Sequence, residues 1–250
     1  MNRRKAVEAT GTTVSKKTLY YYSPASYLFE NLALKRVKVS RITDLNDPYE
    51  VFAINRRSKK AAQQLEEWRR QTNTELGVVC LSKNEWNPVM WAHYADRHRG
   101  VCYRFEVSEA RLCEVNYLCE PEKVDVVDRL SEFDRTDWLM SHKSYEWSYE
   151  KETRMVVKLS DAIHDGGFYF KCFSDTFLLR GIRLGMSCRV SPEAVRAASA
   201  AANLDIKVSK MKMSSTSFRI IENRESRANR GQPRGETRRG KTVSRPGVFG

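Results

Sequence analysis

The sequence predicts an α+β fold, in which a mixed, largely antiparallel sheet carries packed helices within a single domain. Three observations support this class. Strand and helix patterns alternate through the first half of the chain, strand patterns in the second half follow one another with few helices between them, and 41% of the residues are hydrophobic. A doubly wound parallel sheet would need a crossover helix after nearly every strand.

Helices are expected where apolar residues recur at helical spacing behind a capping residue. The first, at 24–34, has Ser23 as its expected cap and Pro24 in its first turn. The others are expected at 59–71, 87–94, 126–138 and 191–202. Short runs rich in β-branched and aromatic residues predict strands at 18–22, 36–40, 75–81, 100–105, 153–159, 167–172, 177–184, 205–211 and 217–221.

The net charge of +13 lies mostly in two terminal segments. Residues 1–17 carry +4 and residues 223–250 carry +6, which leaves +3 for residues 18–222. Both terminal segments have few large apolar residues, so we expect a disordered arm at 1–17, one domain at 18–222 and a disordered Arg/Gly-rich tail at 223–250. The charge of the domain does not imply nucleic acid, whereas the basic tails are candidate contacts for it.

Composition also bounds the cellular setting. The chain has no apolar run of about 18 residues, which argues against a membrane-spanning helix and a membrane partner. Its N-terminal segment lacks the apolar stretch of a secretory signal. The six cysteines form no C-x-x-C pair, which argues against a zinc ribbon. We therefore expect a cytoplasmic protein with reduced thiols and no metal.

The first segment with unusual chemistry follows the second predicted strand. Asn46, Asp47 and Pro48 favour a turn, because Asn and Asp side chains bond their own backbone and Pro restricts the residue before it. One interpretation is a purely structural Asx turn. The other is a loop that presents amide and carboxylate groups, with Glu50 as an acid or base.

The second segment, residues 86–100, is crowded with aromatic and imidazole groups. Trp91, His93, Tyr94 and His98 lie at the end of a predicted helix. His93 and His98 are five residues apart and do not share a helical face, so they make a weak zinc site. Either the aromatics are core residues and the histidines cap the helix, or the segment forms a pocket wall that stacks a base and binds a phosphate or ribose.

The third segment enters the strand expected at 153–159. In strand geometry Glu150, Glu152 and Arg154 would point to one face. Such charges are costly to bury unless they are paired or used. The segment is therefore either a salt-bridged, solvated edge or a carboxylate oriented by Arg154. Glu152, nearer the centre of the strand, is expected to be the better-fixed carboxylate.

Taken in order, these segments resemble the bacterial and phage family called domain of unknown function 2971. The motifs that carry the resemblance are L-Y-x-Y at 19–22, N-D-P-[FY]-E at 46–50, C-[FL]-S at 80–82, [ML]-W-x-H-Y-[AG] at 90–95, H-x-G-[VI]-C at 98–102 and E-x-E-x-R at 150–154. Thr153 stands where the family usually has an aromatic residue. The resemblance covers roughly residues 18–222 and implies no settled chemistry.

A more distant similarity of layout is to ADP-ribosyltransferases. The chain and the ADP-ribosyltransferases share an opening L-Y-x-Y strand, a central aromatic segment and a late glutamate. This similarity implies NAD as a substrate, with its ribose held by Tyr22, its nicotinamide stacked on Tyr94 or Trp91, and a ribose hydroxyl bound by Glu152.

Three functions remain open at this point. One is an enzyme with a pocket for a small nucleotide-type ligand, as in an ADP-ribosyltransferase-like toxin or phage-defence factor, with Glu152, Glu50 and His93 as catalytic candidates. The expected ligand-binding residues are Tyr22, Asn46, Asp47, Trp91, Tyr94, His98, Glu150 and Arg154. The alternatives are a non-catalytic binding module that uses its basic tail and, last, a nuclease. Only an enzyme requires the segments to meet in one cleft.

Deleting residues 223–250 should leave the melting temperature nearly unchanged, because almost no apolar area is lost with them. Thermal unfolding of the truncated and full chains measures the difference. A drop of several degrees would show that the tail contributes to the fold.

Overall fold

The computed structural model describes residues 15–50, 53–55, 57–123 and 132–224. Its strands are β1 (Lys16–Ser23), β2 (Arg36–Arg41), β3 (Leu76–Ser82), β4 (Val101–Ser108), β5 (Leu112–Glu114), β6 (Asn116–Leu118), β7 (His142–Ser144), β8 (Glu152–Lys158), β9 (Ile163–Asp165), β10 (Phe168–Cys172), β11 (Phe177–Leu184), β12 (Lys207–Met213) and β13 (Ile220–Glu222). Its α-helices are α1 (Leu28–Ala33), α2 (Lys59–Glu75), α3 (Pro88–Tyr94), α5 (Glu132–Met140) and α6 (Pro192–Ala201).

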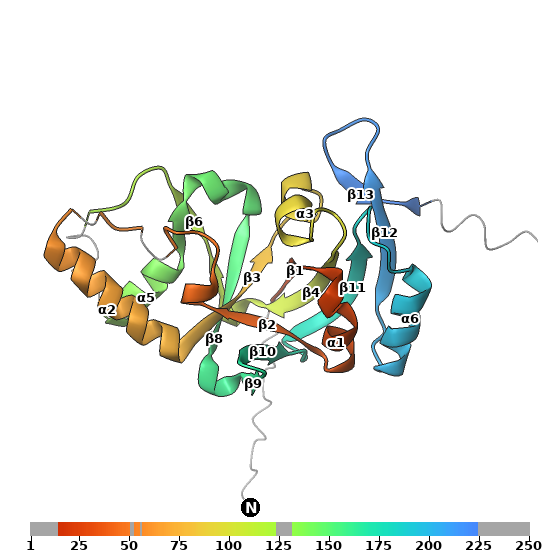
Figure 1. Ribbon diagram of the computed structural model, residues 1–250, viewed down its shortest axis with the longest axis horizontal. Helices are drawn as coiled ribbons and strands as arrows, with labels where there is room; N and C mark the ends of the chain where they lie inside the picture. Colours follow the sequence, from red (N-terminus) through yellow and green to blue (C-terminus); the bar gives the residue numbers. More distant parts are fainter. Residues whose placement is uncertain (1–14, 51–52, 56, 124–131, 225–250) are drawn as a thin grey trace, which may run out of the picture.

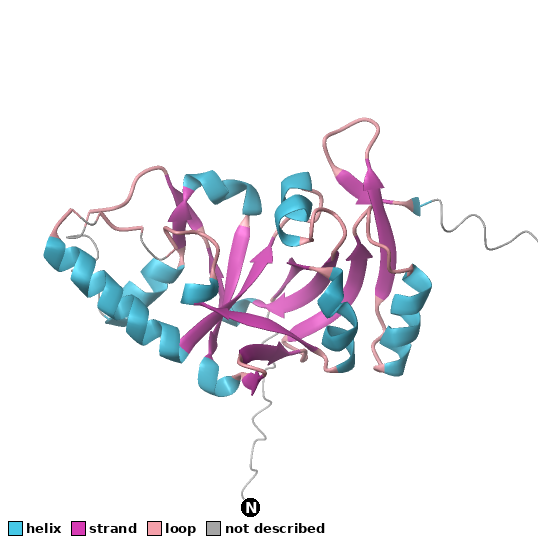
Figure 2. Ribbon diagram, viewed as in Figure 1, coloured by secondary structure: helices cyan, strands magenta, loops and turns pink. Residues whose placement is uncertain are grey.

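These elements confirm the α+β class. Among the described residues, eleven strands form one sheet in the order β13-β12-β11-β4-β1-β3-β2-β10-β9, and β8 joins it by pairing with β3 and β5 (Figure 2). Every pairing in this sheet is antiparallel except that of β11 with β12, which α6 connects. A separate short pair, β6 and β7, is parallel.

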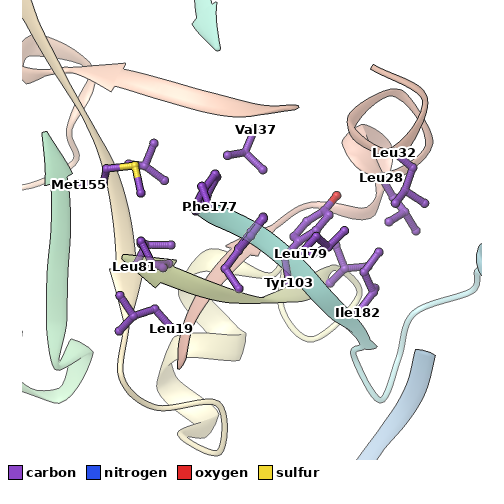
Figure 3. Close-up of a cluster of buried hydrophobic side chains, with 14 of the residues drawn as sticks. Leu19, Leu28, Leu32, Val37, Leu81, Tyr103, Met155, Phe177, Leu179 and Ile182 are labelled. Atoms are coloured by element: carbon purple, nitrogen blue, oxygen red, sulfur yellow. The ribbon is translucent and has the colours of Figure 1, made fainter. Parts of the chain in front are cut away.

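The main core lies where the central strands meet α1. Figure 3 shows Leu28 and Leu32 of α1 beside Tyr103 of β4 and Ile182 of β11, and all four are fully buried. The Asn31 amide donates to the Tyr103 hydroxyl at 3.2 Å. Burial of these side chains supplies the main stabilising term of the domain.

Helices also close the two ends of the molecule. Figure 1 shows α1 and α6 side by side at one end, where they are in contact. At the other end α2 packs on α5, and the Trp68 indole donates to Thr136 Oγ1 at 3.2 Å. One smaller hydrophobic cluster, which contains Leu65 and Leu139, lies at this second contact. A pair of helices in contact with each other therefore lies at each end of the sheet. No helix in the described part of the chain is both long and apolar enough for a membrane span.

Some sequence predictions differ from the structure. Ser23 does not cap a helix, because it ends β1 and its hydroxyl donates to the Pro24 carbonyl; a short 3-10 turn, Ala25–Tyr27, precedes α1. β1 begins at Lys16, inside the predicted arm, and Lys17 Nζ lies 3.0 Å from Glu114 Oε1. β8 begins at Glu152, one residue earlier than expected.

Other sequence predictions lie partly outside the described residues. These are most of the two predicted tails, at 1–14 and 225–250, and the first part of the predicted helix at 126–138, of which the structure describes α5. The strands β5, β6, β7 and β9 were not predicted, because three residues are too few to show a periodicity.

Candidate functional site

The three polar segments meet at one cavity of about 370 Å³. Seven of the predicted site residues line it, from β1, the loop after β2, α3, the 3-10 turn before β8 and the start of β8: Tyr22, Asn46, Glu50, His93, Tyr94, Glu150 and Glu152. Tyr20 and Tyr21 extend its aromatic wall, and Lys38 and Asp44 add charged groups. Segments about a hundred residues apart in the chain thus converge, as the single-site interpretation requires.

Arg154 lies fully buried beneath this cavity and organises its floor. Its Nε and Nη2 atoms donate to the two oxygens of Glu152, each at 3.0 Å. Nη2 also donates to Glu50 Oε1 at 2.6 Å, and Nη1 to the Met140 carbonyl at 2.9 Å. The planar guanidinium suits this forked arrangement. A solvated edge is therefore the wrong interpretation, since β8 lies between β3 and β5.

Lys143 of β7 is a central member of the site and is not among the residues predicted from the sequence. Its Nζ lies 2.7 Å from Glu150 Oε2, 3.6 Å from Glu152 Oε2 and 3.7 Å from Glu50 Oε2. The side chain is almost fully buried. A lone lysine in a three-residue strand carries no local signal, and lysines are rarely buried. Only its position among the three carboxylates reveals its role.

The geometry of the chain at Lys151 lets two nearby glutamates face the same cation. Glu150 ends a 3-10 turn, Tyr145–Glu150, and is not part of β8. Lys151 then adopts the left-handed conformation, with φ of 47°. The condition of strand geometry, under which Glu150 and Glu152 would share a face, is therefore not met at Glu150, although both carboxylates do reach Lys143.

The charges of this cluster separate the pKa values of its carboxyl groups. Burial alone would raise the pKa of Glu152, but the charges of Arg154 and Lys143 outweigh it and lower the pKa to about 2. Burial raises the pKa of Glu50 and that of Glu150 above the usual range, despite their cationic neighbours. Glu152 is thus the fixed anion, and the other two are the groups better suited to hold a proton.

The mouth of the cavity is built by α3, which begins with Asn87 as its cap and Pro88 in its first turn. The Tyr94 hydroxyl donates to Glu150 and accepts from the Asn46 amide at 3.2 Å. Burial, followed by the charge of Glu150, raises the pKa of Tyr94. His93 is exposed beside it, with Nδ1 2.9 Å from the Tyr149 hydroxyl.

Besides the buried Arg154, three predicted ligand-binding residues do not line the cavity. Trp91 is a fully buried core residue whose indole donates to the Glu85 carbonyl at 2.8 Å. Asp47 forms the Asx turn, accepting from the Tyr49 amide at 2.9 Å, and so positions Glu50. His98 lies in a left-handed turn after α3, where its carbonyl accepts from the Ser187 amide at 3.1 Å.

This arrangement can stabilise positive charge and exchange protons. A fixed anionic carboxylate at the floor favours a developing cation, and an aromatic wall can stack a planar ring. Within the described residues, no three His, Cys, Asp or Glu side chains are grouped to hold a metal ion. Lys143 and Arg154 instead supply the cations that neutralise the buried carboxylates.

Replacing Lys143 by Met should lower the free energy of unfolding at neutral pH by about 3–5 kcal/mol, because it leaves three buried carboxylates with one cation. The loss should shrink as the pH falls toward 5. Without Lys143 the folded pKa values of Glu50 and Glu150 rise further above the unfolded value, so protonation favours the folded state at lower pH.

Denaturant unfolding between pH 5 and 8 measures this effect. Lys158→Met, at the exposed end of β8, serves as the matched control and should change stability little. A Lys143→Met protein as stable as the control across this range would contradict the ionic account of the site.

Comparisons with known proteins add one finding. A family model described as a protein of unknown function (DUF2971) matches residues 90–155, from α3 to the middle of β8. No curated protein and no solved structure matches the chain, and the likeness to ADP-ribosyltransferases has no counterpart in these comparisons. The match supports the resemblance to the DUF2971 family over the part of the chain that supplies Lys143, Glu152 and Arg154.

Proposed function

We propose that the protein is an enzyme that binds a nucleotide-type ligand in the cavity, with NAD as its substrate and an ADP-ribosyl group as the transferred unit. The observation that carries the proposal is the meeting of three distant segments around Glu152, which Arg154 holds with two hydrogen bonds of 3.0 Å. A plain binding module has no need of a buried, preoriented carboxylate facing a tyrosine-lined cavity.

Size and charge both suit the nicotinamide end of NAD. The cavity, at about 370 Å³, is of the class typical of small-ligand sites. Its floor holds three carboxyl groups against two cations, which favours a ligand group with positive charge, such as the nicotinamide ring of NAD. Tyr22 and Tyr94 line the wall on which such a ring could stack.

Lys38 is suited to the negatively charged diphosphate of the ligand. It lines the cavity from β2, and its Nζ lies 4.7 Å from the centroid of the Phe168 ring. A cation at this position suits the diphosphate of NAD, whose negative charge the acidic floor would repel. Opposite charges on the ligand would thus meet opposite charges on the protein.

Glu152 is suited to the bond that breaks. In the proposed reaction the bond between ribose C1′ and the nicotinamide nitrogen breaks, its electron pair leaves with neutral nicotinamide, and positive charge develops on the ribose. An anionic Glu152 beside a ribose hydroxyl would stabilise that charge. Each oxygen of Glu152 takes one hydrogen bond from Arg154, which leaves further lone pairs to accept the hydroxyl.

The acceptor of the ADP-ribosyl group attacks ribose C1′ and forms a new bond to that carbon. As it does so it loses a proton, which a second group of the enzyme must receive. His93 is the best-placed candidate, because it lies exposed at the cavity mouth with Nδ1 2.9 Å from the Tyr149 hydroxyl. That contact can orient the ring and fix its tautomer. Glu50 is less suited, since it lies deeper and pairs with Arg154.

Glu152→Gln should lower transfer of label from NAD by about 100-fold, since it removes the charge that would stabilise the transition state. Glu150→Gln should reduce transfer much less. The sequence alone predicts intact folding for Glu152→Gln, but its buried pairing with Arg154 predicts a cost of about 3 kcal/mol. Activity therefore has to be measured on protein shown to be folded.

The assay incubates purified protein with adenine-labelled NAD and cell extract, and follows both labelled product and nicotinamide release. Glu85→Gln is the matched control, because Glu85 is a buried carboxylate paired with Arg183 outside the cavity lining. It should lose comparable stability and keep its activity when folded. A folded, fully active Glu152→Gln protein would contradict the assignment of Glu152 as a catalytic residue.

A further inference from the structure

A second concave surface lies beyond the cavity, where the ends of β3 and α3 meet the loop between β12 and β13. This groove, of about 680 Å³, is lined by Lys83, Asn84, Trp86, Asn87, Pro88, Lys151, Phe218 and Arg219. Three of these residues are cations, two are aromatic and none is acidic. The loop that carries Phe218 projects beyond the sheet at one end of the molecule (Figure 1).

The backbone of the groove is fixed by hydrogen bonds between its parts. The Lys83 amide donates to the Lys151 carbonyl at 3.0 Å, and the Ile220 amide donates to the Trp86 carbonyl at 2.9 Å. The Asn87 side chain donates to the Tyr149 carbonyl at 3.1 Å. Three separate segments are therefore held in one arrangement, and a partner would meet a largely preformed surface.

Phe218 is the feature that most needs a partner. Its side chain is 100% exposed, although a phenylalanine normally buries a large apolar area. Arg219 follows it and is also exposed. Lys151, which also lines the groove, is exposed as well. Lys83 forms a surface ion pair with Glu114 at 2.9 Å, a contact that contributes little to stability.

We propose that this groove binds single-stranded nucleic acid, with its phosphates on Lys151, Arg219 and Lys83 and its bases stacked on Phe218 and Trp86. Cations that follow a backbone, interleaved with aromatic faces, are the combination that recognises unstacked strands. A duplex keeps its bases stacked and could use only the cations. An acidic peptide would match the charge but would leave both rings without a specific role.

The groove and the cavity are separate surfaces formed by the same strand ends. Ser82 and Glu150 line the cavity, while their neighbours Lys83 and Lys151 line the groove. The inference does not depend on the reaction proposed for the cavity, because neither surface shares a lining residue with the other.

Fluorescence anisotropy of the full chain with a labelled 12-nucleotide single strand, and with the matching duplex, tests the proposal. Phe218→Ala should weaken single-strand binding about fivefold or more and leave duplex binding unchanged. Lys151→Asn/Arg219→Gln should lower the slope of log affinity against log salt by about 1.4, since each lost phosphate contact removes roughly 0.7. Asn tolerates the left-handed conformation at position 151.

Two control variants separate the groove from the basic tail, which all proteins in the test retain. Phe168→Ala removes a half-exposed aromatic of β10, and Lys59→Gln/Lys60→Gln removes two exposed cations of α2. Both should bind as the unmodified protein does. Melting curves establish that each variant is folded, and Phe218→Ala removes no buried contact.

The proposal is overturned if the unmodified protein does not bind the single strand, or if Phe218→Ala binds it as tightly as Phe168→Ala. It is also overturned if Phe218→Ala weakens duplex binding equally. Polyglutamate that binds with the same dependence on Phe218 and Arg219 would assign the groove to an acidic peptide instead.

Discussion

The site depends on the pairing of five buried charges: Glu50, Glu150, Glu152, Lys143 and Arg154. A buried charge without a partner costs several kcal/mol, so each member of this group requires the others. The members come from a loop, a 3-10 turn, β7 and β8. Pairing among them therefore fixes where these segments lie relative to one another, in a region where several strands are only three residues long.

The same pairing gives the cavity its chemical asymmetry. Arg154 and Lys143 lie close to Glu152 and lower its pKa. At Glu50 and Glu150 burial is the dominant effect, and it raises the pKa of each carboxyl group. The Tyr94 hydroxyl completes the shell of Glu150. One structural requirement, the neutralisation of buried carboxylates, thus also produces one carboxylate with a lowered pKa and two carboxyl groups with raised pKa values. Such a division is typical of functional sites.

Much of the fold and part of the site could be predicted from the sequence. The longer strands and helices carry clear periodicity, and the density of polar and aromatic residues around Asn46, His93 and Glu152 indicated one shared cavity. Helical spacing could not tell that Trp91 faces the core while Tyr94 faces the cavity. That distinction depends on packing against β1, where Trp91 meets Tyr22 edge to face at 5.3 Å.

Other features had no local signal. Lys143 is one of many lysines, and only the tertiary arrangement places it among three carboxylates. Lysine does not indicate a left-handed conformation, so the turn at Lys151 could not be foreseen. Asp47 and His98 were assigned to ligand binding because of their chemistry, whereas their actual contacts build turns.

Arg154 and Lys143 hold Glu152 as a fixed anion. A titration by carboxyl carbon NMR tests it most directly, with the Glu152 signal assigned by its absence in Glu152→Gln. Because these two cations lower the pKa of Glu152 to about 2, the Glu152 signal should not move as the pH falls from 7 to 4. A midpoint at or above the ordinary glutamate value of about 4.3 would contradict the account.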